Sequence, residues 1–357
     1  MLNLKETTRL ELPAAADMHV HLRQDKMMDL VVPEIKKGGV DTVYVMPNLI
    51  PPVTTVARAL EYKSQLQALE LNVNYLMSLY LHKDITPDVI RAAAAAGVSG
   101  VKVYPQGVTT NSDSGVTDLS LFFPVFAAMQ AVDMVLNIHG ESPQVPADSP
   151  LTLEEAFLPT LATIHAAFPR LRIVLEHCST AAAVEAVKKC GPTVGATITA
   201  HHLYLTEHDA CCDPLAFCKP LPKKPNDRDA LVQALVSGNP KFFFGTDSAP
   251  HPRAAKAQEK PPAGVYTQSY AVQYVLLALE EAVERGVISW ADVTQQKLEQ
   301  FFSSAPRAFY KLPTEETPRI VLERRGETVP ESIKSADGSV EVALSRAGAE
   351  VWSVSWA

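Results

Sequence analysis

The stretch Asp17-Met18-His19-Val20-His21-Leu22-Arg23 decides how the rest of the chain is interpreted. It follows a short apolar run of three alanines and is typical of the end of a β-strand. Successive strand side chains point to opposite faces, so His19 and His21 point the same way, about 6 to 7 Å apart along the backbone. Two imidazoles at this spacing can share a metal ion. An isolated pair is more often a solvated polar face, so the interpretation as ligands depends on later strands.

The composition limits the classes of protein. With 357 residues, 47% of them hydrophobic, the chain is long for an average domain but fits one large α/β barrel with a small appendage. The formal net charge of −8 disfavours nucleic acid or an acidic membrane as the main partner. Charges or prolines interrupt the apolar stretches, and no basic region followed by an apolar one opens the chain. We therefore expect a soluble, cytoplasmic protein.

The cysteines give no sign of a disulfide framework or of a cysteine zinc site. Their number is odd and no C-x-x-C spacing occurs, which predicts reduced thiols. The five are Cys178, Cys190, Cys211, Cys212 and Cys218. The adjacent pair Cys211-Cys212 has no partners at metal-site spacing, and we expect His82, His165 and His208 to face solvent.

Short β-branched or apolar runs alternate with longer segments of helical period, and eight such pairs can be counted. The predicted strands end near His19, Met46, Leu79, Tyr104, His139, His177, His201 and Asp247. The predicted helices cover residues 28–37, 55–70, 87–96, 119–131, 153–166, 181–189, 228–236 and 269–285. Strict alternation implies parallel strands joined by right-handed crossovers, and eight units favour a closed (β/α)8 barrel, the TIM barrel.

Such a barrel has its active site at the carboxyl ends of its strands. His139, His177 and Asp247 each follow an apolar run and therefore meet His19 and His21 at that end. Lys102 is a charge inside an otherwise apolar strand, where a lysine is costly unless it is neutralised, paired or chemically used. The alternative, a lysine that points outward under a helix, stays open from the sequence.

The segment after the barrel changes in character. Residues 289–310 predict one or two extra helices, so we assign residues 1–312 to the barrel and 313–357 to a short extension that packs on it. Within the extension, 340–344 and 351–356 alternate in polarity and predict short strands.

Four histidines, one aspartate and one lysine are more ligands than one tetrahedral zinc needs, which implies two metals. The set resembles the amidohydrolase superfamily. That resemblance implies two Zn²⁺ per chain, with His19, His21 and Asp247 on one ion and His139 and His177 on the other. It also implies that Lys102 is an N6-carboxylysine that bridges the ions together with a hydroxide.

Several motifs narrow the resemblance. Asp17 to Arg23, Met46-Pro47-Asn48, Lys102-Val103-Tyr104-Pro105, Thr109-Thr110-Asn111-Ser112 and Gly245 to His251 are similar to those of dihydroorotases, most closely the single-function type of fungi and bacteria. The resemblance implies reversible cyclisation of N-carbamoyl-L-aspartate to L-dihydroorotate in de novo pyrimidine (UMP) biosynthesis. Asp247 would move the proton between the attacking water and the leaving ring nitrogen. The oligomeric state stays open, with a homodimer as one candidate.

The substrate's exocyclic carboxylate needs a clamp, and the guanidinium fork of Arg23 suits it. The resemblance adds Asn48 and His251 to that clamp, backbone groups near Leu221 and Ala263, and the hydroxyls of Thr109 and Thr110 on a loop that closes over substrate. Taken alone, Asn48 would be a turn residue, Arg23 a surface ion-pair partner and the loop an ordinary polar connection.

Two alternatives stay open. A dihydropyrimidinase or hydantoinase could use the same metal centre on a ring without the carboxylate, although Arg23 and the threonine loop argue against it. A non-catalytic relative of the same fold is the second, although every ligand is present.

His201 and His202 follow the seventh predicted strand, so one of them should face the site and the other should not. We expect structural or supporting roles for both.

Overall fold

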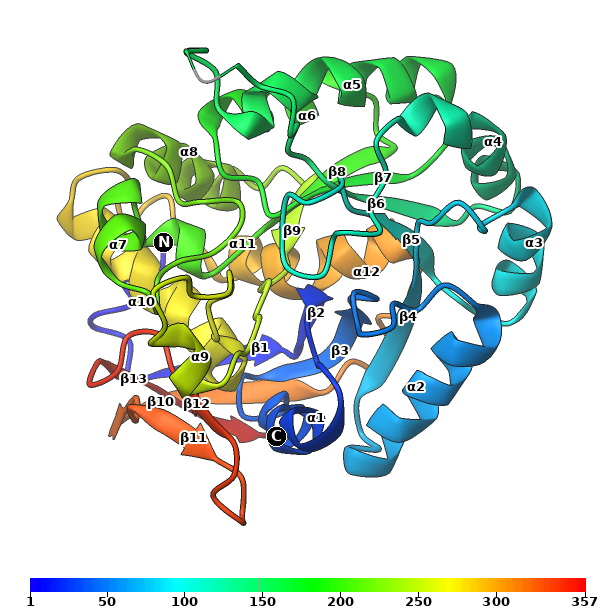
Figure 1. The fold of residues 1–357 in the computed structure, drawn as a ribbon. Coiled ribbons are helices and arrows are strands. Elements are labelled where there is room, and N and C mark those ends of the chain that lie inside the picture. Colours follow the sequence, from blue (N-terminus) through cyan, green and yellow to red (C-terminus); the bar gives the residue numbers. More distant parts are fainter. Residues whose placement is uncertain (147) are drawn as a thin grey trace.

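The computed structural model of the chain describes residues 1–146 and 148–357. Eight parallel strands form one sheet in chain order: β2 (Ala15–Val20), β3 (Val40–Val45), β4 (Asn74–Tyr80), β5 (Gly100–Val103), β6 (Val135–His139), β7 (Ile173–Glu176), β8 (Val194–Ile198) and β9 (Phe242–Phe244). The first and last strands meet where Asp247 N donates to His19 O over 2.8 Å and His21 N donates to Ser248 O over 3.0 Å. Helices surround the strands (Figure 1), which confirms the predicted (β/α)8 barrel.

The helices begin where the sequence offers caps. Thr55, Thr86, Thr152 and Thr180 each accept a hydrogen bond from the backbone N–H three residues later, and Thr152 forms a capping box with Glu155. The α-helices of the barrel are α1 (Asp25–Val31), α2 (Val56–Leu69), α3 (Pro87–Ala95), α4 (Phe123–Ala131), α5 (Leu153–Ala167), α6 (Ala181–Lys189), α7 (Glu207–Cys212), α8 (Pro225–Val236), α9 (Arg253–Lys256) and α10 (Ala271–Glu284). Short 3-10 turns at Val32–Glu34, Leu119–Phe122, His201–Leu203 and Gln268–Tyr270 extend or precede them.

Side chains fill the amino-terminal half of the barrel. Met18, Tyr44, Val174 and Phe243, from four strands, form a buried apolar cluster with Tyr310. Tyr310 belongs to α12 (Ala305–Tyr310), which follows α11 (Gln295–Glu299) and the π-helical turn Gln300–Ser304 and lies behind the barrel in Figure 1. Because this end is packed, the carboxyl ends of the strands are left to hold a ligand.

The terminal extension pairs with the start of the chain. β1 (Arg9–Pro13), β10 (Arg319–Thr328) and β13 (Glu350–Trp356) form an antiparallel sheet, and β11 (Ser332–Lys334) pairs with β12 (Glu341–Ala343). β12 and β13 occupy the two stretches in which strands were predicted, whereas β10 and β11 were not anticipated. The division at residue 312 remains a proposal, because β1 from the first segment is hydrogen-bonded into the sheet of the second.

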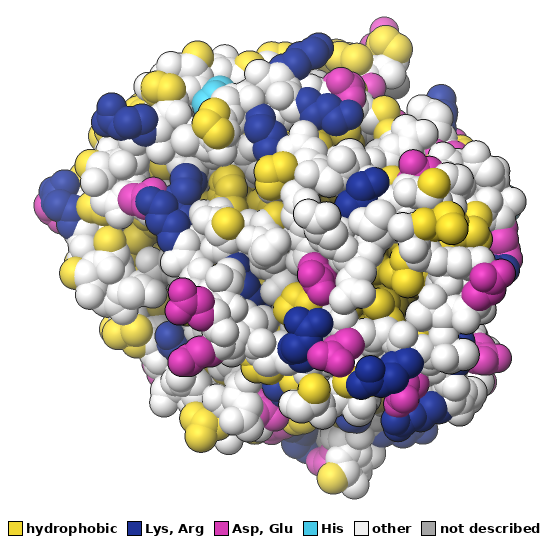
Figure 2. All heavy atoms as spheres, turned by 180° about the vertical axis from the view of Figure 1, so that it is seen from behind, with side chains coloured by type: hydrophobic (Ala, Val, Ile, Leu, Met, Phe, Trp, Pro, Cys, Tyr) yellow, Lys and Arg dark blue, Asp and Glu magenta, His cyan; other side chains and the backbone are white. Residues whose placement is uncertain are grey.

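None of the helices in the described part of the chain is both long and apolar enough to cross a bilayer. On the face seen from behind, basic and acidic side chains are interspersed (Figure 2).

Candidate active site

The structure brings the six predicted ligands together at the carboxyl ends of the strands. His19 and His21 lie at the end of β2, His139 ends β6, and His177 and Asp247 follow β7 and β9. The ring centroids of His19 and His177 are 5.0 Å apart, those of His139 and His177 4.6 Å, and those of His19 and His21 5.4 Å. His177 and Asp247 have φ values of 41° and 47°, a left-handed conformation that is costly for these residues and concentrates at functional sites.

Asp247 lies between two imidazoles. Its Oδ1 atom is 3.2 Å from His19 Nε2 and 3.1 Å from His21 Nε2. Burial raises the pKa of Asp247, but His19 and His21 more than offset this effect and hold the pKa well below its usual value. The group is therefore a carboxylate. Ligands around one tetrahedral zinc lie roughly 3.3 Å apart, and both distances to Asp247 are close to this value. One ligand atom each from His19, His177 and Asp247 also lie within 4.8 Å of one another, so His177 lies close to this group as well.

Buried acceptors orient the imidazoles. Glu176 Oε2 is 2.8 Å from His19 Nδ1, Asn48 Oδ1 is 2.8 Å from His21 Nδ1, and Glu141 Oε2 is 2.7 Å from His139 Nε2. Each contact leaves the other ring nitrogen available as a ligand. Burial lowers the pKa of His19, but Glu176 and Asp247 raise it to about 9, whereas burial lowers that of His21 to about 4.

Glu176 and Glu141 were missed in the sequence. The only available signal was position, because Glu176 directly precedes His177 and Glu141 lies two residues after His139. Asn48 was assigned to the substrate, and the structure shows that its carboxamide oxygen also contacts a predicted metal ligand.

Lys102 is wholly buried in β5, and its Nζ atom has no hydrogen-bond partner in the described part of the chain. It lies 4.9 Å from the centre of the Tyr104 ring. Burial lowers the pKa of Lys102 to about 8, although the Glu176 and Asp247 carboxylates oppose this effect. The interior position rules out an outward-pointing lysine. A buried amine without a partner fits a group that is chemically modified, because the neutral amine is the form that can add carbon dioxide.

Arg23 and His251 form a cationic corner beside the histidines. Arg23 Nε donates to Pro250 O over 3.0 Å, and its Nη2 atom lies 3.2 Å from His251 Nε2. His251 Nε2 is also 2.9 Å from Ala263 O. Burial lowers the pKa of Arg23 to about 10, which leaves the guanidinium charged at neutral pH. This corner can receive an anionic group.

The loop after β5 closes over this corner. Thr110 Oγ1 donates to Ala263 O over 3.1 Å, and Asn48 Nδ2 donates to Thr110 O over 3.0 Å. Figure 1 shows the connection from β5 toward α4 passing over the barrel mouth. Thr109 and Leu221 differ from Thr110 in their contacts. Thr109 N donates to the Ser112 hydroxyl, and Leu221 is 37% exposed. For these two residues the structure gives no direct hydrogen bond to the corner among the described residues.

Comparison with known proteins identifies the family. The amidohydrolase family model matches residues 82–312. The chain is 51% identical to a probable dihydroorotase of Schizosaccharomyces pombe over 91% of this chain and 94% of that protein. The chain belongs to the dihydroorotase family. It is also 43% identical to the dihydroorotase of Saccharomyces cerevisiae, with 97% of this chain and 98% of that protein covered.

The solved structures agree with this dihydroorotase assignment. The crystal structure of the Saccharomyces cerevisiae dihydroorotase in complex with 5-fluoroorotic acid superimposes with a TM-score of 0.90 at 42% identity. The match covers 98% of this chain and 99% of that one. Family membership makes the chain a cyclic amide hydrolase with a metal-dependent site.

Lys256 is a further buried residue at the dihydroorotase site that sequence reasoning missed. Its Nζ atom donates to three backbone carbonyls, those of Phe217 (3.0 Å), Pro262 (3.0 Å) and Gly264 (2.9 Å). Two of these flank Ala263, whose carbonyl contacts Thr110 and His251. Lys256 ends the short sequence Arg-Ala-Ala-Lys, which is typical of an exposed segment. The sequence therefore gives no sign that Lys256 holds the backbone around Ala263.

The remaining histidines differ in burial. His165 was expected to face solvent but is partly buried, and its Nε2 atom accepts a hydrogen bond from Gly191 N over 3.0 Å. His202 Nδ1 is 2.8 Å from Thr199 Oγ1 and its Nε2 is 3.1 Å from Pro220 O, which is a structural role. His201 is buried beside it, and neither ring nitrogen has a partner among the described residues. His208, in contrast, lies on α7 within 4.8 Å of the thiols of Cys211 and Cys212. The expectation that these cysteines lack metal-site partners is wrong.

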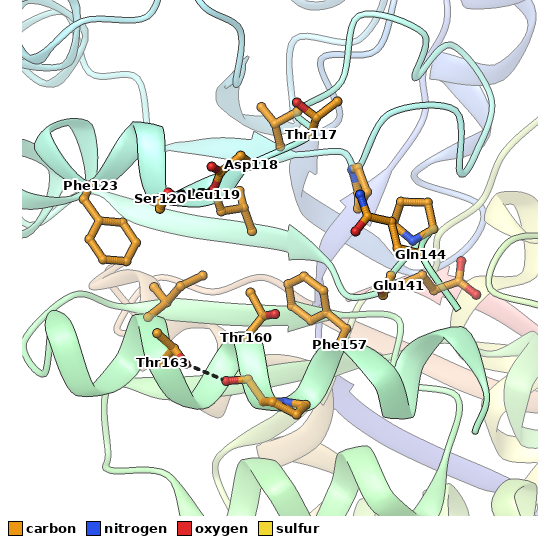
Figure 3. Close-up of a pocket in the computed structure, with 16 residues that line it drawn as sticks. Thr117, Asp118, Leu119, Ser120, Phe123, Glu141, Gln144, Phe157, Thr160 and Thr163 are labelled. Carbon is orange, nitrogen blue, oxygen red and sulfur yellow. Dashed lines mark hydrogen bonds between the residues drawn. The ribbon is translucent and has the colours of Figure 1, made fainter. Parts of the chain in front are cut away.

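A cavity of about 380 Å³ lies beside the dihydroorotase site. Figure 3 shows it between α5, which contributes Phe157 and Thr160, and the segment that contains Asp118 and Leu119. Glu141 is at its edge, with the carboxylate turned away from Phe157 (Figure 3) and bonded to His139. The cavity therefore adjoins the histidine cluster through Glu141.

Proposed function

We propose that this dihydroorotase interconverts N-carbamoyl-L-aspartate and L-dihydroorotate at a pair of zinc ions, as a step of pyrimidine biosynthesis. One observation carries the proposal: the Nε2 atoms of His19 and His21 converge on Asp247 Oδ1, beside a buried lysine without a partner. A cationic corner lies next to this cluster. Metal ligands and a cationic corner lie together at one end of the barrel. This combination fits a metal-dependent reaction on a ring that carries a carboxylate.

The residues present suit two ions. His19, His21 and Asp247 would hold one, His139 and His177 the other, and Lys102 as N6-carboxylysine would bridge them. When bound, the ions supply Lewis acidity and a bridging water that ionises near neutral pH. The buried acceptors on His19, His21 and His139 keep their rings turned toward the metal positions.

Arg23, His251 and Asn48 would bind the exocyclic carboxylate of the substrate. Arg23 is the charged member, and its Nε bond to Pro250 O holds the guanidinium at the site. Burial lowers the pKa of His251 to about 3, so its imidazole is neutral and its Nε2–H can donate to Ala263 O. Backbone groups near Ala263 and Leu221 would then read the amide edge of the ring.

Asp247 would move the proton. In hydrolysis it accepts a proton from the attacking water and delivers it to the leaving ring nitrogen; in cyclisation it takes the proton from the attacking carbamoyl nitrogen and returns it to the departing oxygen. Its low pKa keeps it in the accepting form at the start of hydrolysis.

The loop that carries Thr109 and Thr110 would exclude water during the reaction. In the closed position Thr110 is bonded to Ala263 and Asn48, and His19, Lys102, His139 and His177 are at most 2% exposed. Substrate can reach these groups only when the loop opens, so opening and closing belong to each turnover.

Substrate preference tests the proposal against the hydantoinase alternative. Purified, zinc-loaded enzyme should hydrolyse dihydroorotate far faster than dihydrouracil, which lacks the carboxylate. Arg23→Met should remove most of that preference by raising KM for dihydroorotate. Arg91→Met, at an exposed position of α3, is the matched control and should change neither rate. Equal rates for the two rings with the wild type would contradict the assignment.

Metal analysis tests the centre separately. The proposal requires close to two zinc ions per chain in the active protein, and full activity with one ion or none would exclude it. A cytoplasmic location and a homodimeric assembly belong to the same proposal, and light scattering during size-exclusion chromatography tests the second.

A further inference from the structure

α7 exposes two thiols and an imidazole on one turn of helix. His208, Cys211 and Cys212 are all exposed, although cysteine is among the most buried residue types in proteins. The spacings i, i+3 and i, i+4 place the histidine beside both cysteines. Figure 1 shows α7 toward the left of the molecule, away from the strand ends of the barrel. These residues are therefore separate from the catalytic cluster.

The three ligand atoms are close enough to converge on one ion. One atom from each residue lies within 4.8 Å of the others, and the two sulfur atoms are 2.9 Å apart. Around a tetrahedral zinc, sulfur and nitrogen ligands lie roughly 3.5 to 3.8 Å from one another, since the metal bonds are about 2.3 and 2.0 Å long. The two sulfur atoms lie closer together than this, so the exposed thiol side chains must move apart to hold the ion.

The surroundings admit a cation. Cys211 and Cys212 line a groove of about 600 Å³ together with the carboxylates of Glu207 and Glu259 and with Lys260. The groove is open, so an ion can enter and a water can complete the coordination. Two thiolates and an imidazole are soft ligands, which favours zinc-class ions over calcium or magnesium.

We propose that His208, Cys211 and Cys212 form a surface site for one soft divalent cation, such as Zn²⁺, in addition to the metals of the barrel. The ion replaces the two thiol protons and links the first and last turns of α7. α7 has only six residues, a length at which a helix has little stability of its own. The site therefore fixes the segment that leads from β8 to Leu221.

Cadmium distinguishes this site from the barrel because thiolate–cadmium bonds absorb in the ultraviolet, whereas the barrel cluster offers only nitrogen and oxygen ligands. Zinc-loaded wild-type enzyme, with its thiols counted as free beforehand, is titrated with Cd²⁺. The band should saturate at one ion per chain. It should vanish in Cys211→Ser/Cys212→Ser, and His208→Ala should weaken binding at least about tenfold.

Cys190→Ser is the matched control, because Cys190 is a partly buried thiol that lies outside the cluster, and it should leave the band unchanged. Amide exchange in residues 207–212 should slow when cadmium binds. The double serine variant should keep the barrel zinc and the rate of dihydroorotate hydrolysis, so the surface site and the catalytic proposal fail independently. No thiolate band in the wild type, or an undiminished band in the double variant, would overturn the inference.

Discussion

Glu176 Oε2 lies 2.8 Å from His19 Nδ1 at the centre of the barrel, and both side chains are at most 1% exposed. Glu176 is itself held by Asn137 Nδ2 and Thr197 Oγ1, each at 2.6 Å. This pair fixes the His19 ring so that Nε2 faces Asp247. A carboxylate behind a metal-binding imidazole also increases its basicity as a ligand.

Glu176→Gln should therefore weaken zinc binding by about 10- to 100-fold while the fold is kept, because the amide preserves the shape but removes the charge. The rate of zinc loss to a chelator measures this effect. Glu185→Gln, an exposed residue of α6 that pairs with Lys188, is the control and should retain zinc like the wild type. Unchanged zinc retention in Glu176→Gln would show that Glu176 only fills space.

Lys256→Met should raise KM for dihydroorotate about tenfold and leave the zinc content unchanged. The methionine fills similar volume but leaves the carbonyls of Phe217, Pro262 and Gly264 without their donor, so the backbone around Ala263 loses its position. Steady-state kinetics with metal analysis tests this, and Lys260→Met on the neighbouring exposed segment is the control. A loss of kcat alone would argue against a positioning role.

Lys102→Ala should lower activity by at least about 10³-fold, because the bridging anion disappears and the two cations are left without it. Small carboxylic acids added to the assay should restore part of the activity, since a free carboxylate can occupy the space left by the side chain. Lys188→Ala on the surface of α6 should behave like the wild type. Full activity of Lys102→Ala without added acid would mean that the lysine is not a ligand.

Periodicity was sufficient to predict the barrel, because short apolar runs alternate with segments of helical period through eight units. It placed the end of the seventh strand three residues late, at His201, because apolar and β-branched residues continue beyond Ile198 into a 3-10 turn. The pairing of β1 with β10 was missed because the two strands lie more than 300 residues apart in the sequence. Pairing at that separation leaves no local pattern in the sequence.

The site residues were accessible to sequence reasoning, but the contacts between them were not. No spacing rule predicts that Asn48 bridges His21 to the Thr110 backbone, because this link depends on where a loop closes. The left-handed backbone at His177 and Asp247 is likewise set by the surrounding fold, since only a few per cent of non-glycine residues adopt it. His208 was expected to face solvent and does so, but helical spacing also places it beside two thiols.

The pH dependence of the two directions should be opposite. Hydrolysis of the dihydroorotate monoanion gives a dianion and releases a proton at neutral pH, and cyclisation must take one up. Hydrolysis would need the water at the metal pair ionised as well as Asp247 able to accept a proton, and since Asp247 is already a carboxylate at neutral pH, the water sets the rise of the rate with pH to a plateau. Cyclisation needs a proton to leave with the departing oxygen, so its rate should fall through the same region. Initial rates in both directions across the neutral range provide the measurement. Asp247→Ala should abolish both directions, whereas Arg23→Met should weaken substrate binding and keep both trends. If both wild-type rates rise together with pH, Asp247 does not carry the proton.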